Sequence, residues 1–295
     1  MRADIGRPLA PTTDGVADRS GAVIGTLAAG PSTAGRAVPA GLRPWVETIT
    51  VTDLDGVVDR RTIAVPPDAA PMLVWRTTTS GRGDLLVQGP RTRAEYRRGK
   101  HLPICVQLRL RPGGAQSLLG ADLDAVVDRI APLSELWGRP AHRLSEELVD
   151  LGLDPARVLR RIETVLLERL ARPAQKSEHN RARAGLVRHA LSSLSAGVGR
   201  PPARVRDTAD RLGISERHLR TLFTKAVGVS PQRFARITRV RSVLAASDTD
   251  PAGWSRLAVE AGYYDQSHLT AEFREVMRIT PGSFAAGRLP PAASC

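Results

Sequence analysis

Cysteine is scarce in this chain of 295 residues. There are 2 cysteines, Cys105 and Cys295, and the second is the last residue. A framework of several disulfides and a zinc site built from four thiolates are therefore excluded. So few thiols are typical of a protein of the reducing cytoplasm.

Long apolar segments are also missing. No run approaches the roughly 20 residues that span a bilayer, and the N-terminus lacks the apolar segment of a signal peptide. We therefore predict no membrane partner and a cytoplasmic location.

Metal-binding side chains are few in the first half of the chain, where the only histidines are His101 and His142. A metal-dependent barrel enzyme needs clustered histidines and carboxylates on neighbouring strands. We predict no metal, no cofactor and no catalytic residue. Asp68 and Arg109 could contact a ligand, although a turn-capping aspartate and a solvated arginine are the commoner roles.

Positive charge, nearly all of it arginine, is present in excess. The formal net charge is +13, of which +9 falls in residues 176–295 and +4 in residues 1–175. An excess on one half is typical of a protein that binds the phosphates of nucleic acid. An arginine-rich source proteome is the alternative, so charge alone does not decide the partner.

The same pattern occurs twice between residues 205 and 284. Ala209 and Gly213 recur 49 positions later, and five further residues recur 50 positions later. The second group comprises His218, Leu219, Phe223, Pro231 and Phe234, which recur as His268, Leu269, Phe273, Pro281 and Phe284. Such an internal duplication predicts two copies of one helical unit.

Each copy fits a helix-turn-helix. A glycine, Gly213 or Gly262, ends a short helix, because the left-handed conformation there disfavours a side chain. Ser215 or Asp265 then caps the next helix. Between the copies, residues 230–247 predict a helix of about 25 Å. A rigid spacer of that length can place two recognition helices about one DNA turn, ~34 Å, apart.

The sequence of residues 262–274, Gly-Tyr-Tyr-Asp-Gln-Ser-His-Leu-Thr-Ala-Glu-Phe-Arg, followed by Thr-Pro-x-x-Phe at 280–284, resembles the AraC/XylS family of bacterial transcription regulators. The resemblance covers roughly the last 110 residues. It implies two helix-turn-helix units joined by a long helix, with recognition helices in successive major grooves. One departure is Arg278, which stands where the family usually has glycine, as Gly228 does in the first copy. A strained or differently closed helix end is therefore expected there.

The exposed positions of the two recognition helices supply the candidate DNA contacts. Arginine is the commonest reader of guanine and glutamine can pair with adenine, whereas contacts to phosphate fix the register. For Arg220, base and phosphate contact are equally well supported. The predicted base contacts are Arg217, Arg220, Thr221, Gln266, Ser267 and Thr270. The predicted phosphate contacts are Arg206, Lys225, Arg274 and His268.

The N-terminal half reads as strands and then helices. Short β-branched segments divided by turns predict a β-sandwich or small barrel, with strands at 45–51, 61–65, 72–77, 84–88 and 104–110. Helical spacing follows at 122–130, 143–151 and 155–171, the last with an apolar stripe that either packs on its own domain or pairs with a second copy. Residues 106–120 and 136–138 resemble the sensor half of an actinobacterial-type branch of the family.

The predicted fold class is α+β, with a β-rich N-terminal domain and an all-α C-terminal domain. We assign residues 1–40 to a disordered tail, 41–172 to a sensor or dimerisation domain, 173–180 to a linker, 181–288 to the DNA-binding domain and 289–295 to a tail. The predicted function is sequence-specific regulation of transcription in the nucleoid, and not enzymatic. Candidate partners are double-stranded DNA, RNA polymerase, a small-molecule effector and a second copy of the chain. The alternatives are a barrel enzyme tethered to DNA and a non-specific architectural DNA binder.

Overall fold

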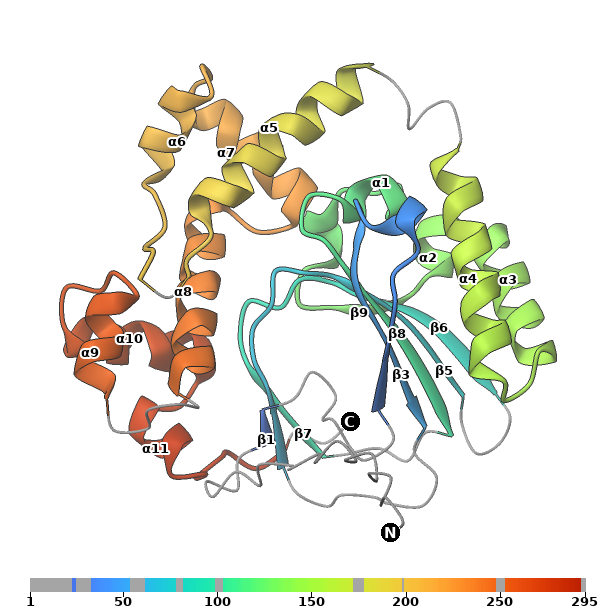
Figure 1. The fold of residues 1–295 in the computed structure, drawn as a ribbon, viewed down its shortest axis with the longest axis horizontal. Helices are drawn as coiled ribbons and strands as arrows, with labels where there is room; N and C mark the ends of the chain where they lie inside the picture. Colours follow the sequence, from blue (N-terminus) through green and yellow to red (C-terminus); the bar gives the residue numbers. More distant parts are fainter. Residues whose placement is uncertain are drawn as a thin grey trace, which may run out of the picture.

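The computed structural model shows a β-rich N-terminal domain and a helical C-terminal domain that lies beside it (Figure 1). The C-terminal domain begins with the helix that starts at Glu178. The residues that the structure describes are 23–24, 33–53, 62–77, 82–98, 103–171, 178–197, 199–247 and 253–292. The α+β fold class and the order of the two domains are as predicted.

The described residues of the N-terminal domain form two β-sheets. The larger has six strands, each paired antiparallel to its neighbours, and the smaller has three, with its first two strands parallel. Across the larger sheet the order is β2 (Thr33–Arg36), β3 (Val46–Asp53), β8 (Ile104–Leu110), β5 (Met72–Thr77), β6 (Gly83–Gln88) and β9 (Ile130–Pro132). The smaller sheet contains β1 (Val23–Ile24), β4 (Thr62–Val65) and β7 (Glu95–Arg98). All five predicted strands are present.

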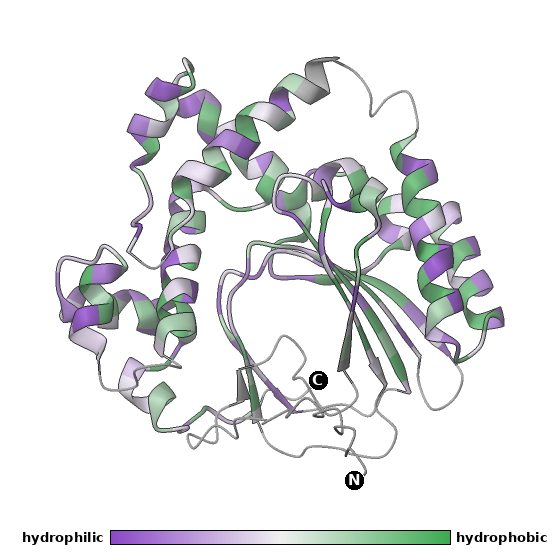
Figure 2. Cartoon of the chain, viewed as in Figure 1, coloured by the Kyte–Doolittle hydropathy of each residue, from purple (hydrophilic) through white to green (hydrophobic). Residues whose placement is uncertain are grey.

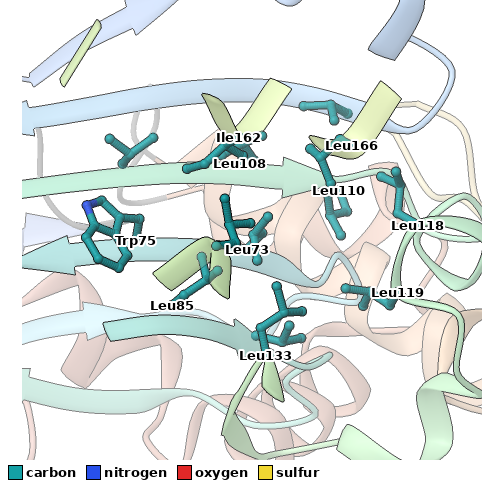
Figure 3. Close-up of a cluster of buried hydrophobic side chains, with 14 of the residues drawn as sticks. Leu73, Trp75, Leu85, Leu108, Leu110, Leu118, Leu119, Leu133, Ile162 and Leu166 are labelled. Atoms are coloured by element: carbon teal, nitrogen blue, oxygen red, sulfur yellow. The ribbon is translucent and has the colours of Figure 1, made fainter. Parts of the chain in front are cut away.

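One face of the larger sheet carries the main core. Alternate residues of a strand point to the same side, and on this side Leu73 of β5 and Leu108 of β8 face Ile162 and Leu166 (Figure 3). Fully burying one such leucine stabilises a fold by about 1.5–3 kcal/mol. The covering elements are η1 (Ala40–Leu42), α1 (Ala115–Leu119), η2 (Leu123–Val126), α2 (Ser134–Trp137), α3 (Arg139–Asp150) and α4 (Pro155–Leu170).

The apolar stripe of helix α4 packs against the core of the N-terminal domain. Asp154 caps the helix, because its carboxylate accepts hydrogen bonds from the N–H groups of Ala156 (2.9 Å) and Arg157 (3.1 Å). The fully buried side chains of the helix all belong to the core of the N-terminal domain; they are Val158, Leu159, Ile162 and Leu166. The stripe therefore packs within its own domain, the commoner of the two predicted roles.

Three sequence-based assignments need correction. Residues 33–36 of the predicted disordered tail form β2, whose backbone pairs with β3, while residues 1–22 and 25–32 lie outside the described part. The predicted helix 122–130 is only a 3-10 turn, because Asp128 is left-handed (φ 55°) and its carboxylate binds the Thr92 N–H at 2.7 Å. Residues 178–180 of the predicted linker belong to the first helix of the C-terminal domain, and residues 172–177 are outside the described part.

The described residues of the C-terminal domain form seven helices. Apolar and polar residues alternate along them, as expected of helices that bury one side (Figure 2). They are α5 (Glu178–Leu194), α6 (Val205–Arg211), α7 (Glu216–Val227), α8 (Pro231–Ser247), α9 (Trp254–Glu260), α10 (Gln266–Met277) and α11 (Pro281–Ala285). In the described part of the chain, no helix is both long and apolar enough to cross a membrane.

The two domains touch along the smaller sheet. Tyr96 of β7 donates a hydrogen bond from its hydroxyl to the Met277 carbonyl (2.5 Å), and the Ala94 N–H bonds to the Val276 carbonyl (2.8 Å). Burial raises the pKa of Tyr96 to about 12, so the hydroxyl remains a donor at neutral pH. The contact fixes the end of α10 to the N-terminal domain.

Candidate nucleic-acid interface

Two helix-turn-helix units of the same construction make up most of the C-terminal domain. Helices α6 and α7 form the first unit, and α9 and α10 form the second. The predicted glycines lie in the turns with left-handed backbones, φ 66° at Gly213 and 77° at Gly262. The predicted caps are also present, with Ser215 Oγ accepting from the His218 N–H (3.1 Å) and Asp265 Oδ1 from the His268 N–H (2.7 Å).

Helix α8 belongs to the cores of both units. Its Phe234 packs edge-to-face on Phe223 in the first unit, with ring centroids 5.4 Å apart. Farther along the helix, Val240 and Leu244 lie in the second core, where Phe273 and Phe284 form the equivalent aromatic pair at 5.9 Å. The two units are therefore held by one continuous helix.

The predicted base-contacting side chains of the first unit lie on α7. Arg217 and Thr221 are exposed, and the Thr221 hydroxyl bonds to the Arg217 carbonyl at 3.1 Å. Arg220 is half-buried and forms an ion pair with Glu216, one turn earlier on the same helix. Arg217 is thus open to solvent in the first turn of the helix, whereas Arg220 would have to leave Glu216 to meet a base.

The predicted contacts of the second unit lie on α10. Gln266 and Ser267 are exposed and Thr270 is half-buried. The Gln266 side-chain carbonyl accepts a hydrogen bond from the Ser255 hydroxyl of α9 (2.7 Å), which links the two helices of the unit. The amide NH2 of this exposed side chain remains available as a hydrogen-bond donor.

The predicted phosphate contacts divide into two groups. Arg206 on α6, His268 at the start of α10 and Arg274 near its end are exposed. Lys225, although exposed, lies 3.4 Å from the Asp122 carboxylate of the N-terminal domain. This places Lys225 at the junction of the domains, away from the beginning of α7.

Two features of the second unit are absent from the sequence-based site. Tyr264, the residue before the cap of α10, is 92% exposed. Glu272 is buried in the same helix, at the position that Leu222 occupies in the first unit by the offset of 50. Alignment of the two copies shows that a charged residue, Glu272, takes the place of a core leucine. Nothing in the sequence indicates that Tyr264 is exposed.

The end of α10 has the same geometry as the end of α7. Gly228 (φ 88°) and Arg278 (φ 61°) are both left-handed, and their N–H groups bond to Thr224 and Arg274 at 2.7 and 2.9 Å. The expected strain at Arg278 is therefore present, because a side chain in this conformation costs about 1–2 kcal/mol.

Single substitutions at these two helix ends should change the free energy of unfolding in opposite directions. Arg278→Gly should raise the free energy of unfolding by about 1 kcal/mol. Glycine removes the strain, and this gain is partly offset because glycine also raises the conformational entropy of the unfolded chain. Gly228→Ala should lower it by more than that, because a Cβ there would also lie 2.9 Å from the Leu123 carbonyl oxygen. Urea unfolding measures both, and a loss of stability in Arg278→Gly would contradict the strain.

No group of three or more histidine, cysteine, aspartate or glutamate side chains arranged to hold a metal occurs among the described residues. Of the two histidines considered for a metal site, His101 lies outside them and His142 is exposed on α3. Cys105 is buried and free, and burial raises the pKa of its thiol.

Comparisons with known proteins agree with the geometry. A family model described as a helix-turn-helix domain matches residues 208–287, which run from the middle of α6 to just beyond the end of α11. No curated protein matches the chain.

Similar solved structures include the C-terminal domain of AraT, a response regulator from Geobacillus stearothermophilus (16% identity, 37% of this chain and 91% of that one, TM-score 0.33). A transcriptional regulator with an AraC-type DNA-binding domain from Chromobacterium violaceum has 22% identity, with 38% and 100% covered and a TM-score of 0.33. ToxT from Vibrio cholerae O395 has 10% identity, with 87% and 98% covered and a TM-score of 0.37.

Two capped recognition helices, two left-handed glycine turns and one connecting helix all fall within or beside the matched range. Residues 208–287 are therefore a helix-turn-helix domain of the AraC type, the DNA-binding domain of a family of transcription regulators.

Proposed function

We propose that this protein is a sequence-specific transcription regulator that inserts α7 and α10 into successive major grooves. The observation that carries the proposal is that the first turns of both helices are exposed while α8 belongs to both cores. With 17 residues, α8 is about 25 Å long, which suits units that meet DNA about one helical turn, ~34 Å, apart.

Selection of bound sequences from a random DNA library tests this function. The full-length protein should enrich a motif with two segments whose centres are about 10 base pairs apart. An architectural binder would enrich no motif, because contacts to phosphate alone carry no sequence information. A single short segment would show that only one unit reads bases.

We assign direct base reading to exposed residues in the first two turns of α7 and the first turn of α10. Arg217 and Thr221 in the first unit, with Gln266 and Ser267 in the second, have side chains that match the edges of guanine, thymine and adenine. Arg220 and Thr270 are half-buried and play a smaller part. Phosphate contact is assigned to Arg206, Arg274 and His268. Lys225 can contact phosphate only when its ion pair with Asp122 is broken.

Substitutions at Arg217 and Arg206 should distinguish a contact to a base from a contact to a phosphate. Arg217→Ala should lose about 1–3 kcal/mol of discrimination at one or two base pairs, because a bidentate contact to guanine is lost. The matched control is Arg206→Ala, which should weaken all sequences alike and lower the salt slope by roughly 1. Titration of correct and single-mismatch operators measures both. Equal weakening of every sequence by Arg217→Ala would contradict the base contact.

The N-terminal domain is proposed to sense a small effector in the nucleoid, with RNA polymerase and a second copy of the chain as further partners. The face of the larger sheet opposite its main core carries buried polar side chains, among them Thr52 of β3, Gln88 of β6 and Gln107 of β8. Polar groups on an inner face favour a ligand with hydrogen-bonding groups. Genomic footprinting with and without candidate metabolites tests this role; unchanged footprints throughout would argue for a purely structural domain.

A further inference from the structure

A cavity of about 710 Å³ lies where the N-terminal domain meets the second helix-turn-helix unit. Its walls come from β7 and the turn before it, the first turn of α8, the end of α10 and Pro290–Pro291. The size falls within the ~300–1,000 Å³ of small-molecule sites. Because both domains line it, anything bound there touches both.

Positive charge dominates the lining. Four arginines, Arg93, Arg97, Arg233 and Arg278, face two carboxylates. One carboxylate, that of Glu95, pairs with Arg97. The lining therefore has an excess of positive charge even with that pair formed.

The other carboxylate is already engaged. Asp128 accepts hydrogen bonds from the N–H and the hydroxyl of Thr92, at 2.7 and 2.6 Å. Arg233 is held by Glu275 at 3.1 Å, outside the cavity. In the described part of the chain, the side chains of Arg93 and Arg278 are exposed and have no hydrogen-bond or ion-pair partner. These two guanidinium groups, one from each domain, are available to a ligand.

The backbone of Arg278 adds an independent observation. The residue is left-handed (φ 61°) where the first unit has Gly228. Glycine would close the helix end without strain, whereas the arginine side chain is strained in this conformation. Strained backbone positions cluster at ligand-binding and other functional sites, and the side chain of Arg278 lines the cavity.

The cavity is not part of the DNA-reading face. Arg278 follows the last residue of α10, and Arg233 lies in the first turn of α8, just after the end of α7. The base-reading residues lie at the opposite ends of α7 and α10. With 12 residues, α10 separates Gln266 from Arg278 by about 18 Å along its axis.

We propose that this cavity binds a small organic anion with two acidic groups, phosphate or carboxylate, one held by Arg93 and the other by Arg278. Arginine suits both groups, because its planar guanidinium donates two parallel hydrogen bonds to phosphate or carboxylate oxygens. A ligand held in this way joins the N-terminal domain to the second helix-turn-helix unit. The site is separate from the inner sheet face proposed for the effector, and its occupation needs no DNA.

Calorimetric titration of the full-length protein tests the site, with inorganic pyrophosphate and citrate as probes at constant ionic strength. At least one probe should bind, and Arg93→Gln and Arg278→Gln should each weaken its Kd about tenfold or more, the loss expected for a hydrogen bond to a charged group. Arg278→Lys keeps the charge and should weaken it less. The matched control Arg143→Gln removes an exposed arginine of α3, which lies on the opposite side of the molecule from β7 and α11 (Figure 1), and it should leave Kd unchanged.

Three outcomes would overturn the proposal. The first is no binding of either probe at millimolar concentration. The second is equal weakening by Arg143→Gln, which would mean diffuse attraction to a basic protein. The third is a DNA salt slope lowered by roughly 1 in Arg93→Gln or Arg278→Gln, which would make these arginines contacts to DNA phosphates. Circular dichroism and urea unfolding of each variant confirm that a lost site is not a lost fold.

Discussion

The variant Val240→Pro is expected to lose the two-segment footprint on DNA. Val240 is fully buried in the middle of α8, in the core of the second unit. Proline there removes one helix hydrogen bond and clashes with the preceding turn, at a cost of ~3 kcal/mol or more. The two units then become loosely joined, and their phasing along the duplex is lost. Footprints should shrink to one segment or vanish.

The matched control is Val240→Ala, which removes side-chain atoms from the same core but leaves the backbone of α8 able to form a straight helix. It should lower stability by roughly 1–2 kcal/mol through lost packing and keep both footprint segments in their positions. Comparing the two variants separates core packing from helix continuity. An unchanged two-segment footprint from a folded Val240→Pro protein would show that α8 does not set the spacing.

The C-terminal domain was predictable because its signals are local. A capping residue, a left-handed glycine and an apolar stripe each act within one or two turns of helix, and the repeat shows each of them twice. The caps at Ser215 and Asp265, the turns at Gly213 and Gly262 and the extent of α8 accordingly agree with the structure.

The features that sequence reasoning missed depend on partners far along the chain. Strand β7 is short. Its Tyr96 is buried against the C-terminal domain, where the hydroxyl donates a hydrogen bond to the carbonyl of Met277, 181 positions away. Strand β2 has the sequence Thr-Ala-Gly-Arg, without apolar alternation, and is held by backbone pairing with β3. The cavity lined by Arg93 and Arg278 arises only when the two domains meet. Local propensity carries none of this information.

The second large expected effect is a loss of stability on removal of the buried carboxylate of Glu272 in the second unit. Glu272 of α10 is 6% exposed, and its carboxylate accepts hydrogen bonds from Arg239 of α8 at 3.1 and 2.7 Å and from the Tyr263 hydroxyl at 2.8 Å. Arg236 of α8 lies 3.3 Å away. Burial and the neighbouring Glu272 raise the pKa of Tyr263, so its hydroxyl stays protonated and donates. Glu272 thus ties the recognition helix to the connecting helix.

The variant Glu272→Ala should lower the free energy of unfolding by about 3 kcal/mol, the lower end of the range for breaking a buried ion pair, because Arg239 remains partly hydrated. The second footprint segment should weaken more than the first, since α10 loses its tie to α8. Glu275→Ala is the matched control one turn later. Its carboxylate pairs with Arg233 and Arg236 but is 44% exposed, so its loss should cost at most about 1 kcal/mol. Urea unfolding and footprinting of both variants measure the difference; equal costs would show that Glu272 holds the second unit no more firmly than a surface ion pair does.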